Sequence, residues 1–179
     1  MRVDGRIRDA VGWLEESRDL RAGLSEDHSD RLLTQQVLAS AYQDNGQVKD
    51  AVRLLEHVVA INERVLTEDH PSRLASQHVL ASACQANGQV KDAVRLLEHV
   101  LAIHKRVLAE DHPDRLTSQQ VLASAYQANG QVKDAVRLLE HVVAIHERVQ
   151  AEDHPHRLTS QYVLAKAHQA YRQLERVDS

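Results

Sequence analysis

The 179-residue sequence has no phenylalanine, one cysteine, three prolines and six glycines, and aromatic residues make up only 3% of it. A single cysteine, Cys84, excludes a disulfide framework. The shortage of proline and glycine disfavours a sheet with many turns, and leucine, valine and alanine have to do most of the packing. These shortages favour an all-α fold. Cys84 itself stands where other copies of the repeat described below have Tyr42 and Tyr126, so we expect it to be buried.

The sequence also lacks an excess of basic charge and a long apolar run. Its formal net charge is −4, which provides no basic field for nucleic acid or for an anionic membrane surface. No apolar run approaches the roughly 18 to 20 residues of a membrane span, and the residues that follow Met1 lack the apolar core of a secretory signal. We expect a soluble, cytoplasmic protein that binds neither nucleic acid nor a membrane.

What the sequence does contain is a repeat of 42 residues. The segment QANGQVKDAVRLLEHV begins at Gln85 and again at Gln127, and a nearly identical segment begins at Gln43. The copies at 68–109 and 110–151 differ at seven positions. A fixed period of this size indicates a repeat architecture.

We therefore expect one continuous domain that consists of three full repeats with half a repeat at each end. The predicted parts are a diverged half repeat and N-terminal cap at 1–25, full repeats at 26–67, 68–109 and 110–151, and a half repeat with a C-terminal cap at 152–179.

Each full repeat is predicted to contain two helices. In the third copy the first helix should begin near Asp111-His112-Pro113, because aspartate can cap free backbone N–H groups and proline is tolerated in the first turn. It should end near Asn129-Gly130, because glycine can adopt the left-handed conformation that closes a helix.

The second helix of the third copy is expected over about residues 131–150. Its apolar residues recur at helical spacing and are predicted to face the core: Val132, Ala135, Leu139, Val142 and Val149.

The two ends of the sequence add one helix each, for a total of eight. Residues 5–20 align with the second helices, and this helix is expected to end near Ala22-Gly23. At the other end Tyr171-Arg172 stands where Asn129-Gly130 makes the turn, so the last helix is predicted to continue to about Arg176.

A short pattern within each copy resembles the tetratricopeptide repeat. In the third copy it comprises the pair Leu122-Ala123, then Tyr126, Gly130, Ala135 and Leu139. The resemblance implies a right-handed solenoid of antiparallel helices, in which the two alanines allow close approach, and a non-catalytic role in binding proteins. The 42-residue length and the Asp-His-Pro opening are similar to repeats of kinesin light chains and of the C-terminal ends of fungal NLR-type proteins. Those NLR-type proteins carry a nucleotide-binding domain upstream, whereas this sequence has no glycine-rich phosphate loop with lysine.

In a tetratricopeptide solenoid the first helices line the concave side. The resemblance therefore implies a groove formed by three outward positions on each first helix: three residues before the alanine of the Leu-Ala pair, one after it and four after it. These residues are Gln36, Ser40, Gln43, His78, Ser82, Gln85, Gln120, Ser124, Gln127, Tyr162, Lys166 and Gln169. Amides and hydroxyls can hydrogen-bond the backbone of an extended peptide with little selectivity. Specificity should then depend on the places where the copies differ, chiefly His78, Gln120, Tyr162 and Lys166.

Twelve histidines raise the hypothesis of a metal or catalytic site. His99 with His104 and His141 with His146 are five residues apart, which separates them by about 140° around a helix. A zinc pair on one helix needs a spacing of three or four residues. No serine or cysteine has an evident base and orienting acid beside it. We expect packing, capping or solvated roles for the histidines, and no catalytic residue, cofactor or metal.

The leading functional interpretation is a protein-interaction module that binds a peptide or protein partner, as the recognition arm of a larger NLR-type sensor. The alternative is a structural repeat that associates with itself, because half a repeat at each end leaves apolar helix faces for a neighbour to cover.

Overall fold

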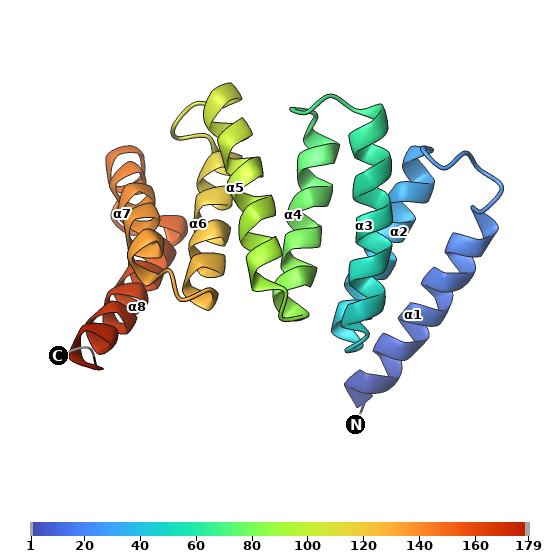
Figure 1. The fold of residues 1–179 in the computed structure, drawn as a ribbon, viewed down its shortest axis with the longest axis horizontal. Helices are drawn as coiled ribbons and strands as arrows, with labels where there is room; N and C mark the ends of the chain where they lie inside the picture. The colour runs from blue at the N-terminus through green and yellow to red at the C-terminus, as the bar shows by residue number, and fades with distance from the viewer. Residues whose placement is uncertain (1, 178–179) are drawn as a thin grey trace. The chain divides into compact units, whose positions relative to one another are not determined.

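The computed structural model describes residues 2–177, and over that range it contains eight α-helices and no strand (Figure 1). Side chains are described for residues 5–174 and 176. The helices are α1 (Arg2–Leu20), α2 (Ser29–Asp44), α3 (Val48–Val65), α4 (Pro71–Ala86), α5 (Val90–Val107), α6 (Pro113–Ala128), α7 (Val132–Val149) and α8 (Pro155–Val177). The prediction of an all-α fold with eight helices is confirmed.

The helices form two compact units, residues 1–93 and residues 94–179. In the first unit α1 packs against α2, α2 against α3, and α3 against α4, and α2 also contacts α4. In the second unit α6 packs against α7 and α7 against α8. Within each unit, helices therefore pack against their neighbours in the sequence, which is the pattern of a repeat protein.

Small residues lie in the core between the helices of the second unit. Ala123 and Ala135 have no exposed surface, and they form one cluster with Leu139 of α7 and Ala167 of α8. Alanine side chains allow two helix axes to approach, and the leucine fills the remaining space. Cys84 is buried with 3% of its surface exposed, as predicted.

A histidine caps the start of each first helix. The Nδ1 atoms of His28, His70 and His112 accept hydrogen bonds from the backbone N–H two residues later, at 3.2, 3.1 and 3.2 Å. His154 does the same for His156 at 3.3 Å. The prediction that the preceding aspartate, such as Asp111, provides the cap was wrong. The helix begins one residue later than that cap would require, so the acceptor next to the free N–H groups is the imidazole.

An arginine joins each second helix to the first helix that follows it. The Nη1 atom of Arg73 donates to the carbonyl of Leu66 at 3.1 Å, just past the end of α3. Arg115 donates to Leu108 at 3.1 Å, past the end of α5. A cation at a helix C-terminus satisfies free carbonyls and opposes the negative end of the helix dipole. We call the segment that contains the capping histidine and this arginine a joint.

The turn between the two helices of a repeat depends on the Asn-Gly pair, as predicted. Gly46, Gly88 and Gly130 have φ angles of 77°, 78° and 80°, in the left-handed region that favours glycine. The residue after each glycine then donates back across the turn, for example from the N–H of Gln131 to the carbonyl of Tyr126 at 2.8 Å.

The second helix of the third copy occupies Val132–Val149, within one residue at each end of the predicted range. The prediction that Val149 is buried was wrong, because 48% of its surface is exposed. Ile145 is the last residue of α7 in the apolar cluster with Leu116 and Val142, and Val149 lies one turn beyond it.

The two end helices behave as predicted. α1 ends at Leu20, two residues before Ala22-Gly23. α8 continues to Val177 without a turn at Tyr171-Arg172, which confirms the expected extension to about Arg176. Tyr171 packs against the cluster of the second unit, and the Lys133 ammonium lies 5.6 Å from the centroid of its ring.

Candidate interaction surface

The twelve predicted groove residues all have at least part of their surface in solvent. Those on α8 and the three serines are exposed, namely Ser40, Ser82, Ser124, Tyr162, Lys166 and Gln169. The others are half-buried, namely Gln36, Gln43, His78, Gln85, Gln120 and Gln127. None is fully buried, so each can contact a partner.

In the first unit the helices that carry these residues touch each other. α2 bears Gln36, Ser40 and Gln43, and it contacts α4 directly. The hydroxyl of Ser40 donates to the carbonyl of Gln36 at 3.3 Å, which leaves the lone pairs of its oxygen available to a donor from outside. α2 and α4 therefore present two adjacent rows of amide and hydroxyl groups.

In the second unit the structure brings together two predicted residues whose contact was not foreseen. The ammonium of Lys166 lies 5.7 Å from the ring centroid of Tyr162, within the range of a cation–π contact. Tyr162 keeps 65% of its surface exposed. The two residues are four apart on one helix, so their spacing could have indicated the contact.

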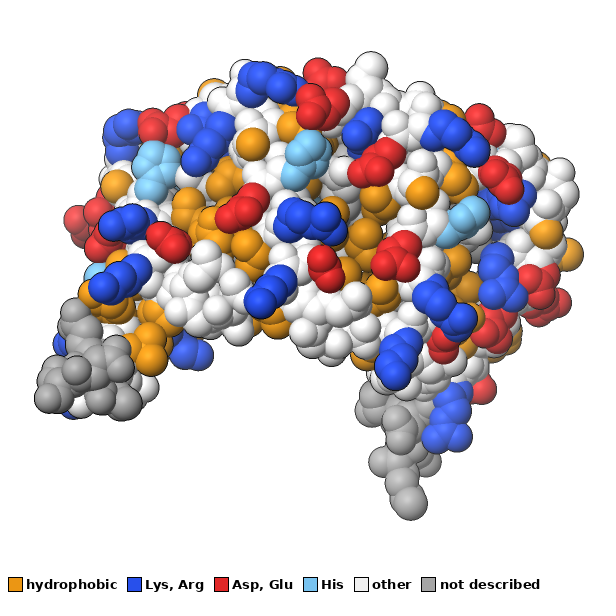
Figure 2. All heavy atoms as spheres, viewed as in Figure 1, with side chains coloured by type: hydrophobic (Ala, Val, Ile, Leu, Met, Phe, Trp, Pro, Cys, Tyr) orange, Lys and Arg blue, Asp and Glu red, His pale blue; other side chains and the backbone are white. Residues whose placement is uncertain are grey.

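Charged side chains of both signs intermingle on the face shown in Figure 2, without a region of one sign. Some charged side chains of the molecule form exposed pairs. Glu110 lies 3.1 Å from Arg148 and 3.4 Å from His141, and Glu26 lies 3.5 Å from Arg64. Such exposed pairs contribute little stability, at most about 1 kcal/mol each. This mixed surface agrees with the small net charge of −4.

A tyrosine links a first helix to the helix before it in each unit. The hydroxyl of Tyr42 donates to Glu15 of α1 at 2.7 Å, and that of Tyr126 donates to Glu98 of α5 at 2.7 Å. Burial, followed by the hydrogen bond to the carboxylate, raises the pKa of both tyrosines. The tyrosines therefore act as neutral donors that hold neighbouring helices together.

Two histidines of the second helices also have a structural role. His146 is only 4% exposed, and its Nδ1 lies 2.9 Å from the hydroxyl oxygen of Ser160. That hydroxyl donates to the carbonyl of Arg157 at 2.9 Å, so its oxygen accepts a hydrogen bond from the Nδ1–H of His146. His104 makes the matching contact with Ser118 at 2.9 Å. Sequence reasoning missed these pairs, although the separation of 14 residues recurs in both copies.

Burial lowers the pKa of His104 and of His146. For His146 the nearby His156 and His154 lower the pKa further. Both imidazoles are therefore held neutral at physiological pH, where they bind serine rather than act as a base. Among the described residues no three histidine, cysteine, aspartate or glutamate side chains gather as a metal site.

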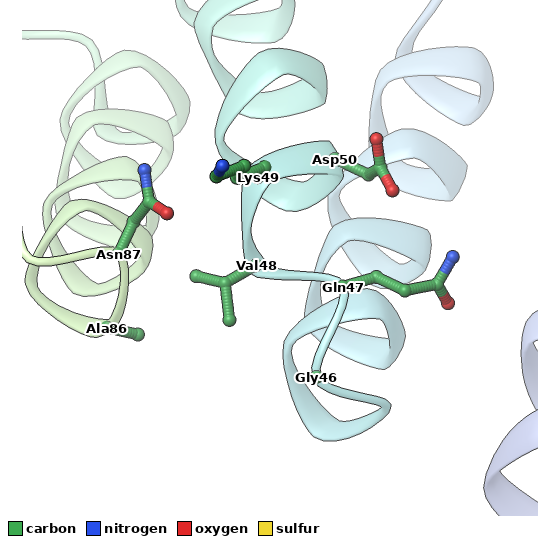
Figure 3. Close-up of a pocket in the computed structure, with 7 residues that line it drawn as sticks. All are labelled: Gly46, Gln47, Val48, Lys49, Asp50, Ala86 and Asn87. Atoms are coloured by element: carbon green, nitrogen blue, oxygen red, sulfur yellow. The ribbon is translucent and has the colours of Figure 1, made fainter.

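Two open hollows lie at matching turns of the two units. The one in the first unit has a volume of about 440 Å³ and is lined by the α2–α3 turn and the end of α4 (Figure 3). Figure 3 shows Val48 on the side toward Asn87, whereas Gln47 and Asp50 point away. The hollow in the second unit has a volume of about 300 Å³ and is lined from Gly130 to Asp134, with Tyr171 and Leu174 opposite. Their recurrence shows that they arise from the geometry of the turn.

Comparison with protein families matches the tetratricopeptide repeat at residues 30–104, 72–148 and 120–176. The chain belongs to the tetratricopeptide repeat family. A search of curated protein sequences finds no match.

Solved structures of tetratricopeptide repeat proteins resemble this chain in fold. Nearly identical TPR-like repeats of a putative kinesin light chain from Podospora anserina are 54% identical over 97% of this chain and 83% of that chain, with a TM-score of 0.87. A point variant of that protein is 52% identical over 97% and 82% of the two chains, with a TM-score of 0.88. BtubC (BKLC) from P. vanneervenii is 16% identical over 99% and 71%, with a TM-score of 0.78, and shows the fold alone.

The predicted tetratricopeptide-type solenoid is thus confirmed, with repeats of the kinesin light chain-like kind. Proteins of this family are generally non-catalytic scaffolds that bind other proteins or peptides. No helix in the described part of the chain is both long and apolar enough to cross a membrane.

Proposed function

We propose that this tetratricopeptide array is a non-catalytic interaction module whose twelve outward residues bind an extended peptide or a protein segment. The observation that carries the proposal is the recurrence of a half-buried glutamine and an exposed serine at the same positions of α2, α4 and α6. A regular row of amides and hydroxyls matches the regular row of N–H and C=O groups on an extended backbone.

Specificity would depend on the positions that differ between repeats. One outward position changes from Gln36 to His78, Gln120 and Tyr162 along the chain, and another changes from serine to Lys166. The exposed tyrosine with lysine across its ring offers a partner an aromatic surface and one positive charge. A carboxylate or a backbone carbonyl is the group that such a pair would attract.

The test is peptide selection with a displayed library against the intact array and against the double variant Tyr162→Ala, Lys166→Ala. The matched control is Arg53→Ala with Arg137→Ala, because these two arginines are exposed on second helices, outside the row. We expect the groove variant to lose at least tenfold in affinity for selected peptides, and the control to lose less than twofold. Peptides that bind both variants equally would refute the groove at this end of the array.

We further propose that the module operates in the cytoplasm as the recognition arm of a larger NLR-type sensor. The proposal rests on the resemblance of the 42-residue repeats to the C-terminal repeats of fungal NLR-type proteins, and the similar repeats of Podospora anserina are also from a fungus. Isolation of the protein from its source, followed by measurement of the mass of the native chain, tests it.

Self-association is the second candidate function. It is favoured by two exposed leucines, one on each end helix. Leu20 of α1 has 79% of its surface exposed, and Leu158 of α8 has 50%.

A further inference from the structure

Leu158 of α8 is exposed at a position where every other first helix has a buried leucine. Its counterparts Leu32, Leu74 and Leu116 are 8, 4 and 6% exposed, whereas Leu158 is 50% exposed. In the second unit Leu116 packs into a cluster with Val142 and Ile145 of the second helix that follows it. In the first unit Leu32 packs with Val58 and Ile61 of α3 in the same way. Within the described residues, no second helix follows α8 to complete the cluster around Leu158.

The missing side of that cluster is present on α1. The alignment of α1 with the second helices places Leu14 at the position of Leu139, and therefore Leu20 at the position of Ile145. Ile145 is 3% exposed, whereas Leu20 is 79% exposed. Ser17 stands where α7 has Val142, so α1 offers a smaller version of the same apolar surface.

A third residue shows that one face of α1 is uncovered in the part of the chain that the structure describes. Trp13 is 71% exposed, and it aligns with Leu138 of α7, which packs against the cluster formed by α6, α7 and α8. α7 packs against α6 on one side and α8 on the other, whereas α1 packs against α2. A tryptophan left this exposed on a helix is typical of a surface that another protein covers.

We propose that a second copy of this chain covers these faces, with α8 of one copy packed against α1 of the next. The contact would continue the pairing already present inside the chain, where α2 pairs with α3 and α6 with α7. The exposed leucine of α8 would meet the exposed leucine of the neighbour's α1, as Leu116 meets Ile145.

The pairing is heterologous, because the two faces that meet are different. Each dimer therefore still has one free α1 and one free α8, and association continues beyond two copies as concentration rises. This proposal goes beyond the binding of a peptide on the outward residues, because Leu20, Leu158 and Trp13 are not part of the twelve-residue row.

The experiment measures the mass of the 179-residue chain by light scattering between about 10 µM and about 1 mM. We expect the mass of the unmodified chain to rise steadily past that of a dimer. Leu20→Asp alone and Leu158→Asp alone should each raise the concentration needed for association at least tenfold. Because both leucines are largely exposed, each variant should keep its helical circular dichroism signal and its melting temperature. Val65→Asp, which changes an exposed valine outside both faces, is the control and should associate like the unmodified chain.

The decisive arm is an equal mixture of the two leucine variants. Leu20→Asp retains a working α8 face and Leu158→Asp retains a working α1 face, so the mixture should form a dimer and nothing larger. A mixture that remains monomeric would overturn the proposal. So would an unmodified chain that is monomeric throughout, or a single variant that associates like the unmodified chain. None of these results depends on peptide binding, so this proposal and the proposed groove can fail separately.

Discussion

Each first helix begins next to a histidine that accepts a hydrogen bond from the helix backbone. The Nδ1 atom of His70 accepts from the N–H of Ser72 at 3.1 Å, through the lone pair of the ring nitrogen. Aspartate, which the sequence suggested as the cap, offers the same kind of acceptor one residue earlier.

We expect His70→Ala to lower the free energy of unfolding by about 0.5 to 1 kcal/mol at pH 7.5, because the N–H of Ser72 loses its acceptor. His70→Asp should retain the cap, because a carboxylate also accepts from that N–H. Urea unfolding followed by circular dichroism measures both variants. A His70→Ala variant as stable as the unmodified chain would contradict the capping role.

A second prediction concerns the imidazoles of His104, which is half-buried, and His146, which is buried. Burial lowers the pKa of His104 and His146 below the ordinary value of about 6.5, so the folded state favours their neutral form. Their contribution to stability is therefore complete above about pH 6.5 and is lost as the pH falls from there through the lowered pKa.

The double variant His104→Asn, His146→Asn should lose clearly less stability than the unmodified chain between pH 7.5 and pH 5. Asparagine is suitable because Asn62 occupies the matching position of the first copy and is 2% exposed there. Replacement of the exposed His57 by asparagine is the control for the same substitution at an exposed position. Urea midpoints across this pH range test the prediction.

At the scale of the helix, glycine has opposite effects at two places. Gly130 closes α6 with a φ of 80°, where any other residue is strained. Gly12 lies inside α1 on an exposed turn, with nothing within 4 Å of an added Cβ. Gly130→Ala should cost about 1 to 2 kcal/mol, whereas Gly12→Ala should add about 0.5 to 1 kcal/mol. Thermal unfolding of both variants measures the two signs, and a destabilised Gly12→Ala would contradict the helical assignment of this segment.

The tyrosine contacts lead to a prediction about pairs of helices. Tyr126→Phe removes the hydroxyl that donates to Glu98, and with it the polar contact between α5 and α6. We expect a loss of about 1 kcal/mol, within the range of a typical net hydrogen bond. A double-mutant cycle with Glu98→Ala, which removes the acceptor, should give a coupling energy of similar size, and additive effects would show that the contact contributes nothing.

Helix boundaries were predictable because a glycine follows the first helix of each full copy, and a proline begins that helix in all copies but the first, which has Ser29. Gly130 has to close α6, and Pro113 can stand only in its first turn, so both ends of the helix follow from local chemistry. The cap was not predictable to the residue, since aspartate and histidine are adjacent and both offer an acceptor. Val149 was misjudged because helical spacing reports the side of a helix on which a residue lies, and not whether a neighbouring helix extends that far.

At the scale of the molecule, stability should be distributed along the array. Removal of α8 by ending the chain at residue 154 deletes the α7–α8 contact and leaves the other pairs in place. We expect a lower urea midpoint with the helices of the remaining repeats retained, because repeat proteins depend on contacts between neighbours. Complete unfolding of the shortened chain would indicate a single cooperative core instead.

The row of outward residues could be proposed from the repeat pattern, because the same helix face recurs every 42 residues. The spacing of four residues on one helix could also have indicated the contact between Lys166 and Tyr162. The two uncovered leucines could not be predicted, since their exposure depends on which helices lie beside them. Leu158 has the same sequence context as Leu116, and only the absence of a following second helix in residues 2–177 makes it different.

The capping histidines also make the array extendable. Every joint contains one imidazole whose Nδ1 accepts from the backbone N–H two residues later, and the four joints repeat the same bond. A longer array built from these repeats would therefore start each added first helix with a cap from its own repeat, and would need no capping residue from outside it.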